Sequence, residues 1–350
     1  EQFYDASLAK IKMLWLDGQF EAANKAANEL CDFAPQMANR NVQLYQGLAL
    51  NALAICRLSA LGLKDAHMMS IRKSDGKDKG PSYSPNQLQE AEDAKAIMKM
   101  ASAILRNSFQ EDRLGGNSME KHELGLAAAA SFINQGTAEL MSVIIKSQLV
   151  GMKLPYDQAL IAYREALNIL DKSDKDSIQK HTSSHKALAY SNMAWTILFA
   201  SSYMNEERGC EKLSEEDLTL ASTYAGEALK IHDIMAKDSS GAIDEKYHSM
   251  GRSLSLVASC YARTGSAVTA EGLLHSAMDY CGVSSNPLCI LDSRSILHNY
   301  SQLCGNWENR DADRKAKEAL AMKKDAELSL PWRGKSSLYS GIFFISMGDL

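Results

Sequence analysis

The chain of 350 residues carries 38 Lys and Arg against 43 Asp and Glu, a formal net charge of -5. This weakly acidic balance gives no concentrated basic face, so nucleic acid is not expected as a partner. Only 6 prolines and 21 glycines occur, whereas Ala, Leu, Lys, Glu and Met are abundant. Because those residues lose little rotamer freedom in a helix, the composition predicts an all-α protein.

The first recurring pattern lies in residues 17–35. Gly18 can close a turn between two helices, and small or apolar residues then follow at three- and four-residue steps. They are Phe20, Ala23, Ala27 and Leu30, with Pro35 ending the unit. Residues at these steps share one helical face, and small ones let two antiparallel helices pack closely. We therefore expect helix hairpins over residues 1–63, the last of them including a long helix from Val42.

Polar stretches interrupt this pattern. Residues 64–86 are predicted to be a flexible insertion, because they hold too little apolar surface to offset the entropy of ordering. Residues 107–117 and 171–184 are expected to be shorter polar connections. Ser214, followed by three acidic residues, predicts the start of a helix. Helical repeats are expected over residues 87–329, with a long helix at 119–149.

The alanine spacing returns at residues 155–171, 218–231, 261–281 and 305–320. The two best copies consist of Tyr156, Ala159, Tyr163, Ala166 and Leu167, and of Gly265, Ala267, Ala270, Leu274 and Ala277. These residues resemble the second helix of the tetratricopeptide repeat, with its pattern G-x-Y/F-x-x-A-x-x-x-F/Y-x-x-A-L. The resemblance implies a right-handed solenoid of antiparallel helix hairpins. The first helices at 8–16, 187–199 and 254–261 depart from the family pattern, and the alternative is another helical-hairpin solenoid with the same packing logic.

In that family, polar residues of the first helices line a concave groove that binds extended peptides. By repeat spacing, the resemblance places the groove here at Lys12, Trp15, Gln148, Trp195, Arg252, Arg263 and Asn299. The family's clamp for a terminal carboxylate is not reproduced in consecutive repeats. Arg252 and Arg263 could meet an acidic segment, because guanidinium matches carboxylate; the alternative is that they pair with Glu245 or Glu271. At this spacing the two tryptophans are more often core residues than ligand platforms.

Residues 330–350 drop the alanine spacing and concentrate large apolar side chains. The residues expected to dock are Trp332, Tyr339, Phe343 and Phe344, next to Ile342 and Ile345. Such a tail is not expected to stand free in water. It must cap the solenoid, lie in its groove or bind a partner.

No motif carries a recognisable chemistry. His181 and His185 would share a helical face as a metal pair does, but no third ligand has a fixed position, so a solvated helix start is favoured. His122 is expected to be exposed beside a polar loop. The 7 cysteines are odd in number and lack C-x-x-C spacing, which favours reduced thiols in a reducing compartment, such as the cytoplasm or an organelle stroma or matrix, over the alternative of disulfides. We predict no catalytic residue, metal or cofactor, and no membrane span.

The leading hypothesis is a non-enzymatic scaffold or adaptor that binds other proteins through the groove or the tail, a step that rests on fold analogy. One alternative is a permanent structural subunit of a large complex, such as a membrane-associated organellar one. Another is an all-α enzyme or small-ligand binder, which would need an enclosed pocket with convergent polar groups. A targeting segment is not readable from a sequence that starts at Glu1.

Overall fold

The computed structural model describes residues 2–16, 19–36, 42–61, 84–111, 118–150, 154–173, 179–202, 214–237 and 243–282. Within these ranges all regular secondary structure is helical, which confirms the predicted all-α class. The described residues up to Ala189 form one compact unit, called unit 1. Those from Tyr190 to Gly282 belong to a second, called unit 2.

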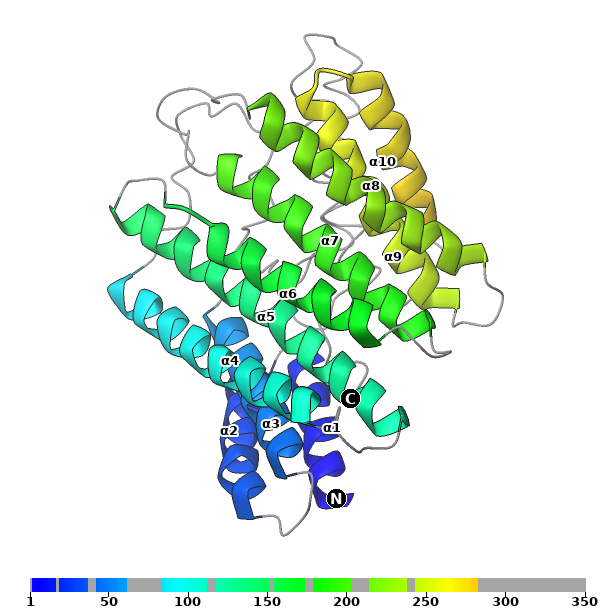
Figure 1. Cartoon of the computed structure of the whole chain (residues 1–350). Helices are drawn as coiled ribbons and strands as arrows, with labels where there is room; N and C mark the ends of the chain where they lie inside the picture. Colours follow the sequence, from blue (N-terminus) through cyan, green and yellow to red (C-terminus); the bar gives the residue numbers. More distant parts are fainter. Residues whose placement is uncertain are drawn as a thin grey trace. The chain divides into compact units, whose positions relative to one another are not determined.

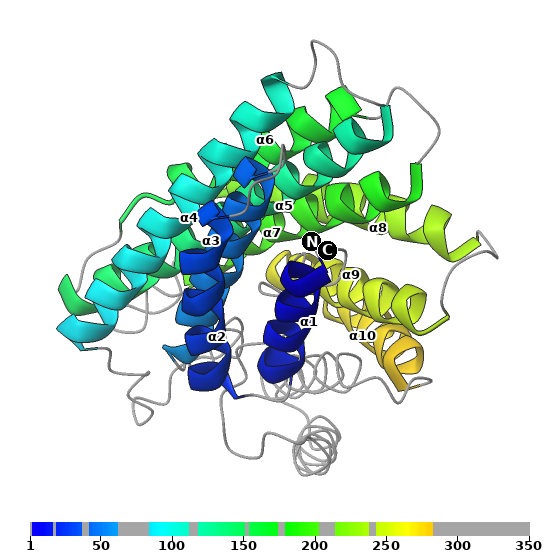
Figure 2. The ribbon, with the colours of Figure 1, turned by 90° about the horizontal axis from the view of Figure 1, so that it is seen from below.

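Unit 1 is built from helices that pack in chain order (Figure 1). They are α1 (Gln2–Leu16), α2 (Phe20–Phe33), the short 3-10 helix η1 (Ala34–Gln36), α3 (Val42–Ala60), α4 (Pro85–Glu111), α5 (Ser118–Val150) and α6 (Asp157–Ser173). Figure 2 shows α3 and α4 side by side. Helix α7 (Gln179–Ser202) begins in unit 1, where Lys186 Nζ lies 2.9 Å from Asp171 Oδ1 of α6. The order of packing is that expected of helix hairpins in series.

Helix α5 is buried on almost all sides between Ala127 and Ile145, because it contacts α3, α4 and α6. Its close approach to α6 depends on Gly136, whose missing side chain leaves room for the ring of Tyr163. Asn134 Nδ2 of α5 donates a hydrogen bond of 2.9 Å to Asn51 Oδ1 of α3, and both residues are buried. A buried amide without a partner would cost free energy, so this bond favours one register of the two helices.

Unit 2 contains the end of α7, α8 (Glu215–Lys237), α9 (Ile243–Arg263) and α10 (Ala267–Gly282). Again neighbours in sequence pack together: α8 on α9, and α9 on α10. The rings of Tyr190 and Tyr224 stack with centroids 6.1 Å apart and join α7 to α8. Ser214 Oγ accepts the backbone N–H of Asp217 at 3.0 Å, which confirms the predicted start of α8.

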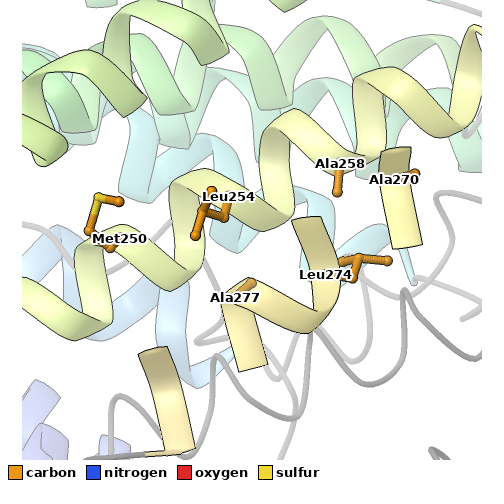
Figure 3. Packing of buried hydrophobic residues seen from close by; sticks show 6 residues of the cluster. All are labelled: Met250, Leu254, Ala258, Ala270, Leu274 and Ala277. Atoms are coloured by element: carbon orange, nitrogen blue, oxygen red, sulfur yellow. The ribbon is translucent and has the colours of Figure 1, made fainter. Parts of the chain in front are cut away.

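The hairpin of α9 and α10 turns at Gly265, as its place in the repeat pattern predicts. Gly265 has φ +83°, the left-handed conformation that glycine adopts without steric cost. The N–H of Ser266 bonds to the carbonyl of Tyr261 at 3.0 Å and that of Gly265 to Ala262 at 3.3 Å, the Schellman pattern of a helix end. The two helices bury a joint cluster, shown in Figure 3, of Met250, Leu254, Ala258, Ala270, Leu274 and Ala277.

Alternate helices bury the same pattern of three residues, spaced i, i+4 and i+7. The sets are Ala23, Ala27 and Leu30 in α2; Ala94, Met98 and Ala101 in α4; Ala159, Tyr163 and Ala166 in α6; Ala221, Ala225 and Ala228 in α8; and Ala270, Leu274 and Ala277 in α10. Four of these faces were predicted from sequence. The copy in α4 was missed, although its spacing is the same.

Several boundaries differ from the predicted ones. Helix α4 begins at Pro85, inside the range 64–86 expected to be a flexible insertion, because Ser84 caps it. Ser84 Oγ accepts the N–H of Gln87 at 3.3 Å and the Gln87 side chain accepts the N–H of Ser84 at 2.9 Å, a capping box with proline at the first helical position. The polar connections are also shorter than expected, since α4 runs to Glu111 and α6 to Ser173. The repeat copy at 305–320 and the tail at 330–350 lie outside the described residues.

Candidate binding surfaces

The predicted groove positions of unit 1 include one core residue. Trp15 is only 5% exposed, and its Nε1 donates a hydrogen bond of 2.9 Å to Ser59 Oγ of α3. Lys12, one turn earlier, is half-buried. Gln148 lies in the last turn of α5, and its side chain is outside the described residues. Trp15 therefore holds α1 on α3 through its buried ring. This is the core role that the sequence analysis weighed against a ligand-binding role.

In unit 2 the predicted groove positions follow α9. Arg252 and Arg263 are half-buried, and Ser255 and Ser259 lie between them on the same helical face and are buried. Ser259 Oγ donates to the carbonyl of Ser255 at 3.0 Å, so this hydroxyl is satisfied within the helix. Both arginines interact with other groups of the chain. The result is a polar stripe flanked by two guanidinium groups, which we call the α9 stripe. Trp195 of α7 is buried, and Asn299 lies outside the described residues.

A cluster of charged side chains joins α4 to α5. Lys99 Nζ lies 2.6 Å from Glu139 Oε1, and Lys95 Nζ lies 4.0 Å from Glu139 Oε2. Lys95 also pairs with Glu92, which accepts a hydrogen bond from Ser142. The side chain of Glu139 is 6% exposed, so its charge depends on the two lysines. We call this set, Glu92, Lys95, Lys99, Glu139 and Ser142, the α4–α5 charge cluster.

The pKa of Glu92 shows how these groups balance. Burial alone raises the pKa of this carboxyl, but the hydrogen bonds from Lys95 and Ser142 and the positive charges of Lys95 and Lys146 outweigh burial. The pKa of Glu92 therefore lies below its ordinary value. The two acids and two lysines of the cluster neutralise one another. The cluster therefore serves to hold α4 on α5. Sequence reasoning missed the cluster, although Glu92, Lys95 and Lys99 share one helical face.

The histidines that sequence analysis weighed are more buried than expected. His185 is buried, so a fully solvated start of α7 is wrong at this residue. His122 is half-buried, and both its ring nitrogens are shielded from solvent, contrary to the predicted exposed position. His232 Nδ1 of α8 lies 2.7 Å from Ser253 Oγ of α9, but Ser253 has no exposed surface on which a substrate could meet it. Among the residues with a described position, no three His, Cys, Asp or Glu side chains gather as a metal site would require.

Three described cysteines carry free thiols in unreactive surroundings. Burial and the neighbouring charge of Asp32 raise the pKa of Cys31 to about 12. Burial and the nearby Cys31 likewise raise the pKa of Cys56 to about 12. Burial also raises the pKa of Cys260, against an opposing hydrogen bond from Ser222. Because the thiolate is the reactive form of cysteine, the raised pKa values lower the expected reactivity of these three thiols at neutral pH.

An exposed apolar surface lies on α1 and was missed by sequence analysis. Phe3 is 61% exposed and Met13 71% exposed, and Ala6 and Ala9 between them are exposed as well. At 3.6 residues per turn these four side chains fall within about a third of the helix circumference. Phe33 of α2 extends the surface, with its ring centroid 4.8 Å from that of Phe3 in an edge-on arrangement. We call Phe3, Ala6, Ala9, Met13 and Phe33 the α1 outer surface.

The opposite side of α1 is the one that faces the core of unit 1. Tyr4 and Ile11 have no exposed surface, and the Tyr4 hydroxyl donates to the carbonyl of Tyr45 in α3 at 2.5 Å. Helix α1 is thus apolar on both sides. The signal in the sequence was the neighbouring apolar pair Phe3 and Tyr4, since two successive residues of a helix do not share a narrow buried face.

Comparison with known proteins adds no name to these surfaces, since no family model and no curated protein matches the chain. A search of the described helices for a stretch long and apolar enough to cross a membrane finds none. The surfaces are therefore interpreted from their own chemistry.

Proposed function

We propose that this protein is a non-enzymatic scaffold that binds another protein, and that its helices form a right-handed, tetratricopeptide-like array of hairpins. The recurring buried set in α2, α4, α6, α8 and α10 supports the hairpin array, because each copy packs a helix on its neighbour with the same small residues. The observation that carries the binding role is the α1 outer surface.

The α1 outer surface has the properties of a contact site. Burying a side chain such as Phe3 or Met13 contributes roughly 1.5–3 kcal/mol each, which an exposed position leaves unused. The rings of Phe3 and Phe33 give a rigid apolar patch, and the unbranched side chain of Met13 adapts to different partners. Phe3 and Met13 lie about 15 Å apart along α1 at 1.5 Å per residue. This length fits the apolar face of a partner helix of two to three turns.

The α9 stripe offers a second contact for an acidic segment of the partner. Its two arginines are half-buried and lie three helical turns apart, and the positive charge of each guanidinium attracts a carboxylate. Binding through this stripe is electrostatic and weakens with salt, whereas binding through the α1 outer surface does not. The salt dependence of capture therefore separates the two contacts.

The experiment is affinity capture from the native source with the full chain and two matched variants. Met13→Asp places a charge in the α1 outer surface, and Ile234→Asp places the same charge at a 69% exposed position of α8 in unit 2. We expect the first variant to lose a defined set of proteins, by about tenfold for a contact of roughly 1.4 kcal/mol, and the second to keep them. If Met13→Asp captures the same proteins in the same amounts as the unchanged chain, the proposed binding role is wrong.

A further inference from the structure

We infer that the α1 outer surface is the docking site of the chain's own C-terminal segment Ile342-Phe343-Phe344-Ile345. On the proposed function, this segment covers the surface until a partner protein displaces it. Only the displacement by a partner protein depends on the proposed function. The contact within the chain is inferred from the chemistry of the segment and of the α1 outer surface.

The segment and the surface match in chemical character. Ile342 to Ile345 are four consecutive large apolar residues without a charge, flanked by small residues at Gly341 and Ser346. The α1 outer surface offers two aromatic rings and a thioether. Aromatic side chains pack edge to face with the rings of Phe3 and Phe33, and a methionine sulfur such as that of Met13 packs favourably at a ring edge.

The two parts also match in length. Four extended residues span about 13 Å at roughly 3.3 Å per residue. The apolar surface between Phe3 and Met13 is about 15 Å long on α1, at 1.5 Å per residue. The extended segment therefore spans most of the length of the surface, and two of its four side chains face α1, because successive side chains of an extended chain point to opposite sides.

Connectivity favours this occupant over a separate molecule. The described residues end at Gly282, and residues 283–341 connect them to the segment. A connection of that length does not limit reach, at about 3.3 Å per extended residue. A tethered segment meets its site at an effective concentration that approaches the millimolar range, so a weak apolar contact is occupied within one chain.

The test is hydrogen exchange and amine crosslinking of the full chain at low concentration, without a partner. The variant is Phe343→Ser with Phe344→Ser, and its matched control is Ser336→Ala with Ser337→Ala, which changes two small residues of the same tail. We expect the first variant to speed amide exchange in α1 by roughly tenfold, with α9 and α10 unchanged, and the control to have no effect. A crosslink between Lys10 and Lys335 within monomers is expected in the unchanged chain and lost in the Phe343/Phe344 variant.

A second variant tests the contact from the other side. Met13→Asp should abolish the same crosslink and speed exchange in residues 339–350. The inference is overturned if exchange in α1 ignores the tail variant, if both tail variants have equal effects, or if the crosslink appears only between two chains as concentration rises. In the last case the occupant is a second copy.

Partner capture separates this inference from the proposed function. If the tail covers the surface and a partner uses it, the Phe343/Phe344 variant captures more of the proteins that Met13→Asp loses. If capture depends on Met13 while the tail leaves α1 unaffected, the intramolecular contact is wrong and the binding role stands. If the tail protects α1 but Met13→Asp captures the same proteins as the unchanged chain, the binding role is wrong and the intramolecular contact stands.

Discussion

One methyl group added at Gly136 should destabilise unit 1. A Cβ atom at Gly136 would lie 2.5 Å from Cε1 and 2.7 Å from Cδ1 and Cζ of Tyr163. Tyr163 is fully buried, and its hydroxyl lies 3.3 Å from Thr137 Oγ1, so the ring cannot move aside without losing packing and that contact. Overpacking of this kind costs about 3 kcal/mol, the upper part of its usual range, because three ring atoms are too close. Alanine returns about 1 kcal/mol as a better helix former than glycine, so Gly136→Ala should lower the free energy of unfolding by about 2 kcal/mol.

Urea denaturation followed by far-UV circular dichroism measures this change. The matched controls are Gly226→Ala in α8 and Gly272→Ala in α10, where an added Cβ meets no atom within 4 Å. These two helical glycines should each give a gain of about 0.5–1 kcal/mol, since only the entropy of the unfolded chain and the helix propensity change. The variant Tyr163→Leu provides the second arm, because a smaller side chain leaves room for the methyl group.

Chemically identical glycine-to-alanine substitutions are therefore expected to change the free energy of unfolding in opposite directions at Gly136 and at the two control positions. In a double-mutant cycle, Gly136→Ala should cost less in the Tyr163→Leu background than in the unchanged chain, with a coupling of about 1–2 kcal/mol. If Gly136→Ala stabilises the protein as much as the two control substitutions do, α5 and α6 do not approach each other as closely as described. An absent coupling with Tyr163 would show that the cost arises elsewhere.

Three further predictions concern the α4–α5 charge cluster and the buried thiols. Lys99→Met should destabilise unit 1 by about 2 kcal/mol, because Glu139 stays buried with one distant lysine, and Lys99→Met with Glu139→Met should recover most of this loss in urea melts; no recovery would contradict the pairing. The lowered pKa of Glu92 stabilises the fold above the ordinary glutamate pKa, so stability should fall as pH drops from there towards the folded pKa. Glu92→Gln should flatten that part of the pH profile, and an unchanged slope would contradict the assignment. Cys31 and Cys56, with pKa values raised from 9.0 to about 12, should resist iodoacetamide at pH 8 until urea unfolds the chain, and stability should decline as pH rises from 9 towards 12. Rapid alkylation of the native chain, read by mass spectrometry, would contradict their burial.

The helical class and much of the hairpin packing were predictable from sequence because they depend on local spacing. Ala221, Ala225 and Ala228 share a face through the helical period alone, and small residues on one face predict a close neighbour. Gly265 likewise marks its turn, since a left-handed residue at a helix end favours glycine. The start of α4 was also local, but the capping signal of Ser84 and Gln87 was hidden by the polar stretch before it.

Which residues remain exposed was decided by tertiary packing. Phe3 and Tyr4 are adjacent and both apolar, and only the position of α3 determines that Tyr4 is buried while Phe3 lies in the α1 outer surface. Glu139 and Lys99 are distant in sequence, so their ion pair exists only because α4 and α5 lie side by side. The helical period determines which side chains share a face. Which face is buried, and which side chains pair, depends on the neighbouring helices and therefore on contacts between residues far apart in the chain.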